Sequence, residues 1–454
     1  MNRIGPAFGQ VVTLTSLGVL WSANGAASPL SLKALQQQIS HLQQQVREIK
    51  REHRQNVQAD RAGSARSSAS NEPSTAVAQT HTTSGIVKQD RSTHPHRSLS
   101  LGGSATLEYY KKQRRSDNST GGGANFGRFV LNIHGQYGRW SFGIEQRFYN
   151  FKNGDIFHYG WGARRIGVNG RHQLKFGFYQ VPFGNLRYGF YGFWGSLAYF
   201  AGYTNNQADG VGYRYQHGPW RLDADFFKND DAGQTATYGA NPSAGYNRIN
   251  GLDVRAAYTL GNRSRNHATV SFSARGGQLA VGDGDATGTH FAVSAAAAGD
   301  YGLWGVQAQL VDFQFNVPRG QNFDGVRLPT DSVAIEHYGF PARLPARGQI
   351  AGLNLARHLL TLGSKDVHFK LYNDAGYLHS SNGKFDSAGH RIGNTVFDVA
   401  GLAIHHGPFF VWLEGLAGRN AGLAGLRPND GRWHWRANAT FGVYFHSKLP
   451  TKDH

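Results

Sequence analysis

The segment WHWRANATFGVYF, residues 433–445, shows most clearly how this chain folds. Large or apolar residues stand at every second position, from Trp433 through Phe441 to Phe445, and mostly polar or small residues lie between them. Successive side chains of a β-strand point to opposite faces, so this alternation predicts a strand with one apolar and one polar face. A strand of a transmembrane barrel has this pattern because one face contacts lipid and the other faces water.

The same alternation recurs from Ser98 onward, in segments of about ten residues. Three clear examples place apolar residues on one face: Phe129, Leu131 and Ile133; Leu174, Phe176 and Phe178; and Leu222, Ala224 and Phe226. The stretch 349–359 is less clear, because its periodicity also fits a helix. We expect a strand there because barrels of this class have an even number of strands.

Connections of two lengths alternate between these segments. Short turns are expected near 138–139, 169–171, 217–218, 261–266, 299–302, 360–365 and 406–407. Longer loops are expected near 114–125, 152–160, 184–208, 231–248, 282–287, 318–348, 381–393 and 420–432. Seven turns and eight loops imply sixteen strands, with both ends of the barrel on the side of the short turns. The sequence therefore predicts an all-β protein, a 16-stranded antiparallel transmembrane β-barrel.

The composition agrees with this fold. Hydrophobic residues make up only 39% of the 454 residues, whereas glycine is frequent at 60 and aromatic residues reach 13%. A helical membrane protein needs long apolar stretches that this chain lacks. Five tryptophans are expected near strand ends, where they would form an aromatic girdle: Trp140, Trp161, Trp220, Trp304 and Trp433. The absence of cysteine excludes disulfides and thiolate metal sites.

The N-terminal region predicts export. Arg3 precedes an apolar segment at 11–21, and small residues follow at 25–27, the pattern of a secretory signal peptide. We expect residues 1–27 to be a signal peptide and the barrel, 98–446, to reach the bacterial outer membrane through the periplasm, with 447–454 as a periplasmic tail.

Two further segments precede the barrel. An apolar seam with spacings of three and four residues predicts a short coiled-coil helix over 28–53: Leu32, Leu35, Ile39, Leu42, Val46 and Ile49. This seam predicts self-association that assists an oligomer formed elsewhere in the chain, although a helix that packs on its own domain remains open. Residues 54–97 have almost no large apolar side chain and predict a flexible linker.

The charge of the chain points to an anionic partner. The formal net charge is +18, and residues 97–454 hold 37 basic and 24 acidic residues, an excess of 13. A basic surface can attract nucleic acid, anionic lipid or anionic solutes, and export leaves the outer-membrane lipid and small anionic solutes as the expected partners, with no nucleic acid.

Alternation places seven basic residues on the lumen side, and we expect them to line the pore: Arg147, Lys175, Arg221, Arg255, Arg275, Lys370 and Arg436. Guanidinium groups suit oxyanions because they bind them with two parallel hydrogen bonds. Four acidic residues share these faces, so pairing across strands is an alternative role for the same cations: Glu145, Asp223, Asp225 and Asp253.

Two motifs resemble one family. The segment GFYQVPFG, residues 177–184, resembles the strand-to-loop motif of the phosphate-selective porin O/P family, and 210–213 followed by 218–222 resembles its next hairpin. The resemblance implies a trimeric, anion-selective porin whose third loop folds inward and narrows the pore. A ring of loop lysines such as the family uses for phosphate does not align, and His446 to His454 extend past the usual terminal aromatic residue, Phe445.

On this sequence the third loop is 184–208. Its expected constriction residues are Arg187, Tyr188, Tyr191, Trp194 and Tyr199. Together with Phe190, Phe193 and Phe200, the aromatic members could instead form a ladder on which sugars slide. The main hypothesis is therefore an anion-preferring porin for small solutes such as phosphate, and the alternative is a carbohydrate-selective porin.

Other function classes have little support. No motif places a serine or aspartate with a histidine for hydrolysis, so we expect no enzyme and no catalytic residue. His405 and His406 are adjacent on an expected strand and point to opposite faces, so they cannot easily share a metal ion. Glycine-rich stretches lack the strand-to-helix context of a nucleotide site, and we expect no cofactor. A purely tethering role for the helix and the linker remains a minor alternative.

Overall fold

The computed structural model describes Gln44 and residues 97–449, with gaps at 114–121, 151–153, 168, 187, 231–245, 262–265, 283–285, 321, 324–325, 338–339, 360–366, 382–392 and 427–428. The expected signal peptide, coiled-coil helix and linker lie outside the described residues, apart from Gln44 and from Arg97, which begins the first strand. The chain divides into two units, 1–77 and 78–454, and every barrel strand belongs to the second.

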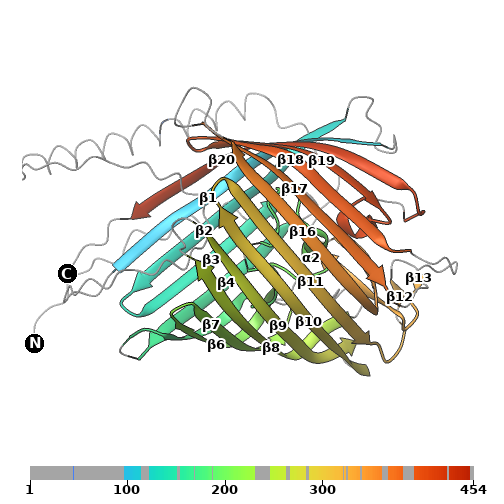
Figure 1. Cartoon of the computed structure of the whole chain (residues 1–454), viewed down its shortest axis with the longest axis horizontal. Coiled ribbons are helices and arrows are strands. Elements are labelled where there is room, and N and C mark those ends of the chain that lie inside the picture. The colour runs from blue at the N-terminus through green and yellow to red at the C-terminus, as the bar shows by residue number, and fades with distance from the viewer. Residues whose placement is uncertain are drawn as a thin grey trace, which may run out of the picture. The chain divides into compact units, whose positions relative to one another are not determined.

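Sixteen strands form one closed antiparallel barrel, which confirms the predicted fold (Figure 1). Each strand pairs with the next along the chain, and the last pairs with the first, so no edge is left open. The strands are β1 Arg97–Lys112, β2 Gly123–Tyr137, β3 Trp140–Tyr149, β4 Asp155–Ile166, β5 His172–Gln180, β6 Gln207–His217, β7 Trp220–Asn229, β8 Tyr246–Gly261, β9 His267–Val281, β10 Ala286–Tyr301, β11 Trp304–Asn316, β16 Arg347–Leu359, β17 Val367–Ser380, β18 Thr395–His406, β19 Phe409–Arg419 and β20 Trp433–Leu449.

The predicted alternation matches the exposure of the side chains. In β3, Phe142, Ile144 and Phe148 are exposed, whereas Glu145 and Arg147 between them are buried. The same two-residue rhythm runs through the other strands, so the apolar residues cover the outer surface of the barrel. The stretch expected at 349–359 is a strand: β16 pairs with both β11 and β17. No helix among the described residues has the length and apolar character to cross a membrane.

The tight turns follow from glycine. Gly138, Gly218, Gly302 and Gly407 each begin a two-residue connection and have φ values of 55–57°. Glycine adopts this left-handed backbone without steric cost, and hairpin turns of this kind match the twist of the strands. The longer connections lie at the other ends of the strands. The loop expected at 152–160 is shorter than predicted, because β4 begins at Asp155. Residues 156–158 already alternate between buried and exposed.

Four of the five tryptophans expected in the girdle are exposed at strand ends: Trp140, Trp220, Trp304 and Trp433. Trp161 is the exception. A bulge in the β3–β4 pairing at Glu145 and Gln146 shifts the alternation of β4, so that Trp161 turns inward, with Lys175 Nζ 4.4 Å from its ring centroid.

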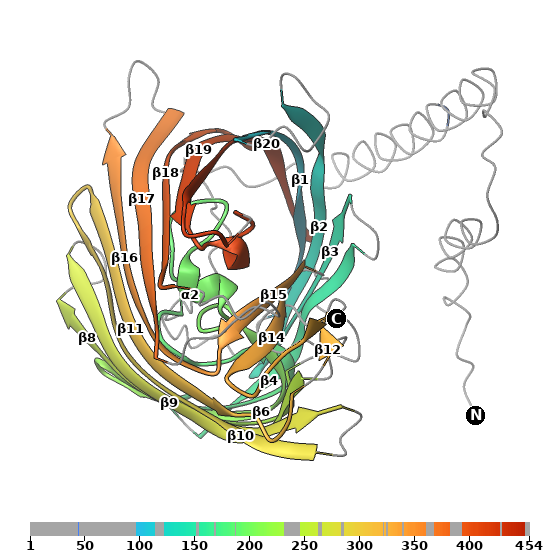
Figure 2. The same cartoon turned by 90° about the vertical axis from the view of Figure 1, so that its right-hand side faces the viewer.

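Two long loops carry small elements of secondary structure. The loop after β5 contains the short helix α2, Leu197–Phe200, and the loop after β11 contains the hairpins β12–β13 and β14–β15. Their bounds are β12 Asn322–Phe323, β13 Val326–Arg327, β14 Ser332–His337 and β15 Phe340–Pro345, and the loop after β19 adds the 3₁₀ turn η3, Gly422–Ala424. Figure 2 shows α2 and the β14–β15 hairpin within the barrel outline. Residues of all three loops share one hydrophobic core, so these loops pack on one another.

Candidate functional site

The motif at residues 177–184 leads the chain into the barrel. β5 ends at Gln180, and the next residues no longer pair as a strand: Val181 N–H donates to Asn206 O (2.8 Å) and Phe183 N–H to Val181 O (2.9 Å). The side chains of Tyr179, Val181 and Phe183 are at most 3% exposed. The alternate apolar residues of the motif are therefore buried inside the barrel, where they pack at the start of the loop. We call residues 181–186 and 201–206 the loop root, and residues 188–194 the loop tip.

Backbone hydrogen bonds fix the loop root to three neighbouring strands. Gly184 N–H donates to Ser273 Oγ of β9 (3.1 Å), and Asn185 N–H donates to Gln309 Oε1 of β11 (3.2 Å). Arg255 Nε of β8 donates to Gly184 O (3.0 Å). Gly184 has φ +61°, a backbone that favours glycine, and a Cβ there would lie 2.2 Å from Gln309 Nε2 and displace the amide that donates to Tyr203 O.

Two carboxylates hold the loop tip. Asp374 of β17 accepts hydrogen bonds from Tyr191 N–H (2.8 Å) and Gly192 N–H (2.6 Å). Glu414 of β19 accepts from Phe193 N–H (2.7 Å). Because one carboxyl group accepts from two successive N–H groups and the other from the next, these two side chains orient the tip.

Further side chains of the barrel wall also donate to carbonyl oxygens of the loop. These bonds are Asn354 Nδ2 to Gly189 O (2.7 Å), Gln309 Nε2 to Tyr203 O (3.0 Å), Lys370 Nζ to Tyr191 O (3.2 Å) and a guanidinium nitrogen of Arg275 to Gly202 O (3.4 Å). The wall thus supplies hydrogen-bond partners to loop carbonyls both near the tip and at the root.

All seven basic residues expected on the lumen side lie on the face opposite to the exposed apolar residues, but they make different contacts. Arg255, Arg275 and Lys370 bind the loop backbone. Arg147 pairs with Glu145 (2.6 Å), and Arg221 shares Asp223 with Arg214 (2.8 and 2.7 Å). Lys175 and Arg436 lie over aromatic rings. Many of the basic residues that the sequence predicts to line the pore therefore bind the loop or pair with a carboxylate.

The loop tip meets the wall formed by β1–β3 and β20. Arg128 of β2 lies over the ring of Phe193 (4.5 Å), and Arg436 of β20 lies over the ring of Trp194 (4.1 Å). Tyr188 reaches Arg147 of β3 with its hydroxyl. Glu108 of β1 is close enough to Arg128 and Arg436 to interact with both charges. This contact between tip and wall is the candidate functional site.

The expected constriction residues divide between the tip and the core. Tyr188 is 38% exposed, and Tyr191 and Trp194 are partly exposed, with the Trp194 indole N–H donating to Ala424 O (3.1 Å). Tyr199 is only 7% exposed and packs in α2 against Phe190 and Phe200. Arg187 lies outside the described residues. A continuous aromatic ladder along the loop is therefore interrupted at α2.

Apolar side chains pack around the loop root. Tyr203 of the root packs on Phe313 of β11 (ring centroids 5.2 Å apart), and Leu328 and Leu344 of the loop after β11 are fully buried in the same core. Burial raises the pKa of the Tyr203 hydroxyl well above its usual range, so the side chain is a neutral phenol.

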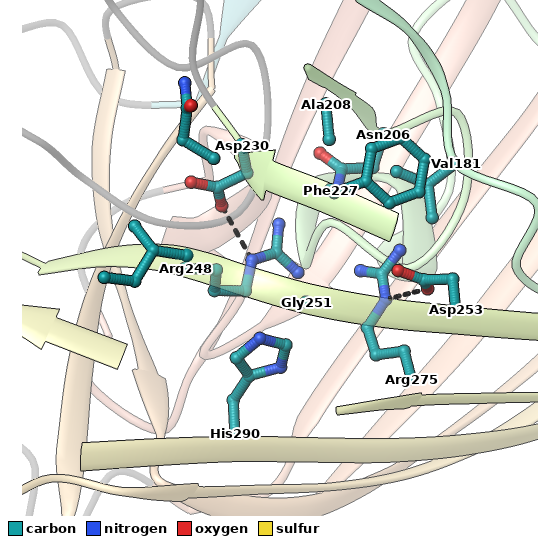
Figure 3. Close-up of a pocket in the computed structure, with 12 residues that line it drawn as sticks. Val181, Asn206, Ala208, Phe227, Asp230, Arg248, Gly251, Asp253, Arg275 and His290 are labelled. Atoms are coloured by element: carbon teal, nitrogen blue, oxygen red, sulfur yellow. Dashed lines mark hydrogen bonds and ion pairs between the residues drawn. The ribbon is translucent and has the colours of Figure 1, made fainter. Parts of the chain in front are cut away.

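A small polar cavity lies next to the loop root (Figure 3). Its volume is about 20 Å³, which holds roughly one water molecule. Two ion pairs line it, Arg248 with Asp230 (2.7 Å) and Arg275 with Asp253 (2.8 Å), beside His290. The cavity is too small for a solute, and within the part of the chain that the structure describes no three histidine, aspartate or glutamate side chains gather as metal ligands.

Several residues of this site are absent from the sequence-based expectations. Arg128 has the same inward register as Val130 and Asn132, so its strand pattern could have identified it. Asp374 and Glu414 carry no such signal, because nothing in their own strands indicates that a distant loop donates to them.

No protein-family model matches the chain, and no curated protein matches it. The resemblance to the phosphate-selective porin O/P family therefore has no support from a family model. Similar solved structures are outer-membrane porins and channels. They include an anion-selective porin from Comamonas acidovorans (12% identity, TM-score 0.47, 77% of this chain and 100% of that one), OprB of Pseudomonas putida (8%, 0.49, 78% and 94%) and the channel DcaP of Acinetobacter baumannii (11%, 0.47, 78% and 98%). At these identities the likeness concerns the fold alone.

Proposed function

We propose that this chain forms a water-filled channel in the bacterial outer membrane that prefers small anions, with phosphate and other oxyanions as candidate solutes. The observation that carries the proposal is the cluster of Arg128, Arg147 and Arg436 where the loop tip meets the wall. Two carboxylates, Glu108 and Glu145, accompany these three guanidinium groups. In a narrow passage of low dielectric, an excess of fixed positive charge attracts anions and repels cations.

The overall charge supports the same preference, since residues 97–454 carry 13 more basic than acidic residues. The carbohydrate alternative has weaker support, because Tyr199 and Phe200 of the expected aromatic ladder are buried in α2. Arg187 remains a proposed constriction residue from its sequence position beside the tip.

Single-channel recording in a planar bilayer tests the proposal. Under a potassium chloride gradient we expect a reversal potential on the anion side, and phosphate added to the chloride background should lower the chloride current. A maltodextrin should leave the current unchanged at the same concentration. A cation-side reversal potential, or block by maltodextrin without block by phosphate, would contradict the proposal.

We further propose that the chain assembles as a homotrimer, assisted by the expected coiled-coil helix at 28–53. Native gel electrophoresis of the full chain and of a variant lacking residues 28–97 tests this. We expect trimers from both, with the shorter chain dissociating at a lower temperature, and both should conduct. A conducting monomer from the full chain would refute the trimer.

The proposed location is tested by fractionating cells that express the full chain. We expect the protein in the outer-membrane fraction, without residues 1–27. Recovery in the inner membrane would contradict both the expected signal peptide and the outer-membrane assignment.

A further inference from the structure

At the loop tip, two of the wall arginines, Arg128 and Arg436, each lie over an aromatic ring. The guanidinium carbon of Arg128 lies 4.5 Å from the ring centroid of Phe193. Arg436 lies between two rings, 4.1 Å from Trp194 of the loop and 4.9 Å from Tyr110 of β1. Loop and wall thus present guanidinium groups and aromatic faces alternately at one place.

This arrangement combines two kinds of recognition. A guanidinium group has five N–H donors, and Arg436 uses one of them, Nε, on Asn438 Oδ1, while a carboxylate binds such donors in pairs. An aromatic ring that carries a guanidinium over one face can still meet another ring at its edge. A solute with a carboxylate and an aromatic ring can use both groups at once.

Exposure distinguishes the tip from the rest of the loop. Arg128, Arg436, Tyr110, Phe193 and Trp194 are all partly exposed, and Tyr188 is 38% exposed. By contrast, Phe183 and Tyr203 of the root are 2% exposed. Solvent, and therefore a dissolved solute, reaches the rings and guanidinium groups of the tip but not those of the root.

We propose that the loop tip and its arginine wall form a recognition site for small aromatic carboxylates, with benzoate as the simplest member. This inference rests on the proposed anion channel and names the solute class of the same site. An inorganic oxyanion would use the guanidinium groups alone, and a sugar would use the rings alone. The aromatic carboxylate accounts for both the positive charge and the aromatic loop of this chain.

The test compares four anions as blockers of chloride current through the full-length protein in a planar bilayer: benzoate, cyclohexanecarboxylate, acetate and phosphate. Benzoate and cyclohexanecarboxylate have the same charge and similar size, but only benzoate has an aromatic face. We expect the half-blocking concentration of benzoate to be roughly tenfold lower than that of cyclohexanecarboxylate, the size of effect that one good stacking contact supplies.

The decisive variant is Phe193→Leu, which removes a ring that makes no side-chain hydrogen bond among those described at the tip. It should abolish the preference for benzoate over cyclohexanecarboxylate in channels that still conduct. Trp304→Leu is the matched control, because Arg357 stacks on Trp304 at 5.1 Å on the outer surface of the barrel, away from the lumen. It should behave like the unchanged protein.

The outcomes separate the two proposals. An anion-side reversal potential with benzoate no stronger than cyclohexanecarboxylate would overturn the aromatic-carboxylate site and leave the anion channel standing. A benzoate preference that survives Phe193→Leu and Trp194→Leu together, in a protein that still forms conducting channels, would also overturn the site. Loss of anion preference in the unchanged protein would overturn the channel proposal itself.

Discussion

The root and the tip of the inward loop are adjacent in sequence but differ in environment. The root, represented by Phe183 and Tyr203, is buried in an apolar core with Phe313 and the loop after β11. The tip, from Tyr188 to Trp194, is partly exposed and faces arginines of β2 and β20. The difference indicates that the root fixes the position of the loop, whereas the tip is available to a solute.

The largest expected effect comes from breaking the root. Phe313→Ala removes a fully buried ring that packs on Tyr203, and we expect a loss of about 3–5 kcal/mol in the free energy of unfolding. Urea unfolding of the barrel in lipid vesicles measures it. Phe272→Ala, on the outer face of β9 with 69% exposure, is the control and should cost less than half as much. Equal losses would mean that the root is not a packed core.

Removing a carboxylate that holds the tip comes next. Asp374→Ala leaves Tyr191 N–H and Gly192 N–H without their acceptor, and a typical hydrogen bond contributes about 0.5–1.5 kcal/mol. We expect a noisier open-channel current, because the tip is no longer fixed, with the barrel still folded. Asp374→Asn keeps one acceptor oxygen, so its current noise should lie between that of the unchanged protein and that of Asp374→Ala. A steady current from Asp374→Ala would show that the tip is held by other contacts.

A smaller change tests where the loop enters the lumen. Gly184→Ala and Gly218→Ala both place a side chain at a positive φ, which costs about 1–2 kcal/mol. Only Gly184→Ala also meets Gln309, because Gly218 has open space around it. We therefore expect an altered conductance in Gly184→Ala alone. The same conductance change in both variants would argue against the close fit at the root.

The smallest expected effect concerns a pair away from the tip. Arg221→Gln leaves Asp223 bound to Arg214 (2.7 Å), so the carboxylate keeps a cationic partner, and we expect a small loss in stability and a small shift in the reversal potential. Arg147→Gln should shift the reversal potential further, because its pair with Glu145 is nearly buried and lies beside Tyr188. A larger shift from Arg221→Gln would move the selective region away from the tip.

Much of the barrel could be predicted from the sequence. In β3 or β20, each side chain lies on the outer or the lumen face according to its position in the strand, and glycines such as Gly138 mark the turns. Because these features are local, residue order alone predicts the number of strands and the face on which most side chains lie. It also predicts that Arg147 and Arg436 point inward. Trp161 shows the limit, because a bulge in the β3–β4 pairing shifts the alternation by one residue.

What the sequence by itself determined is the barrel and the set of basic residues that turn toward its interior. Only the tertiary structure decided which of them hold the loop and which face the tip. Asp374 and Tyr191 are 183 residues apart, and Phe193 and Glu414 are 221 apart, so no local pattern joins them. The backbone N–H and C=O groups of a loop inside a barrel pair with side chains of the strands that lie next to them. Those strands lie next to the loop only when the sixteen strands form the closed barrel.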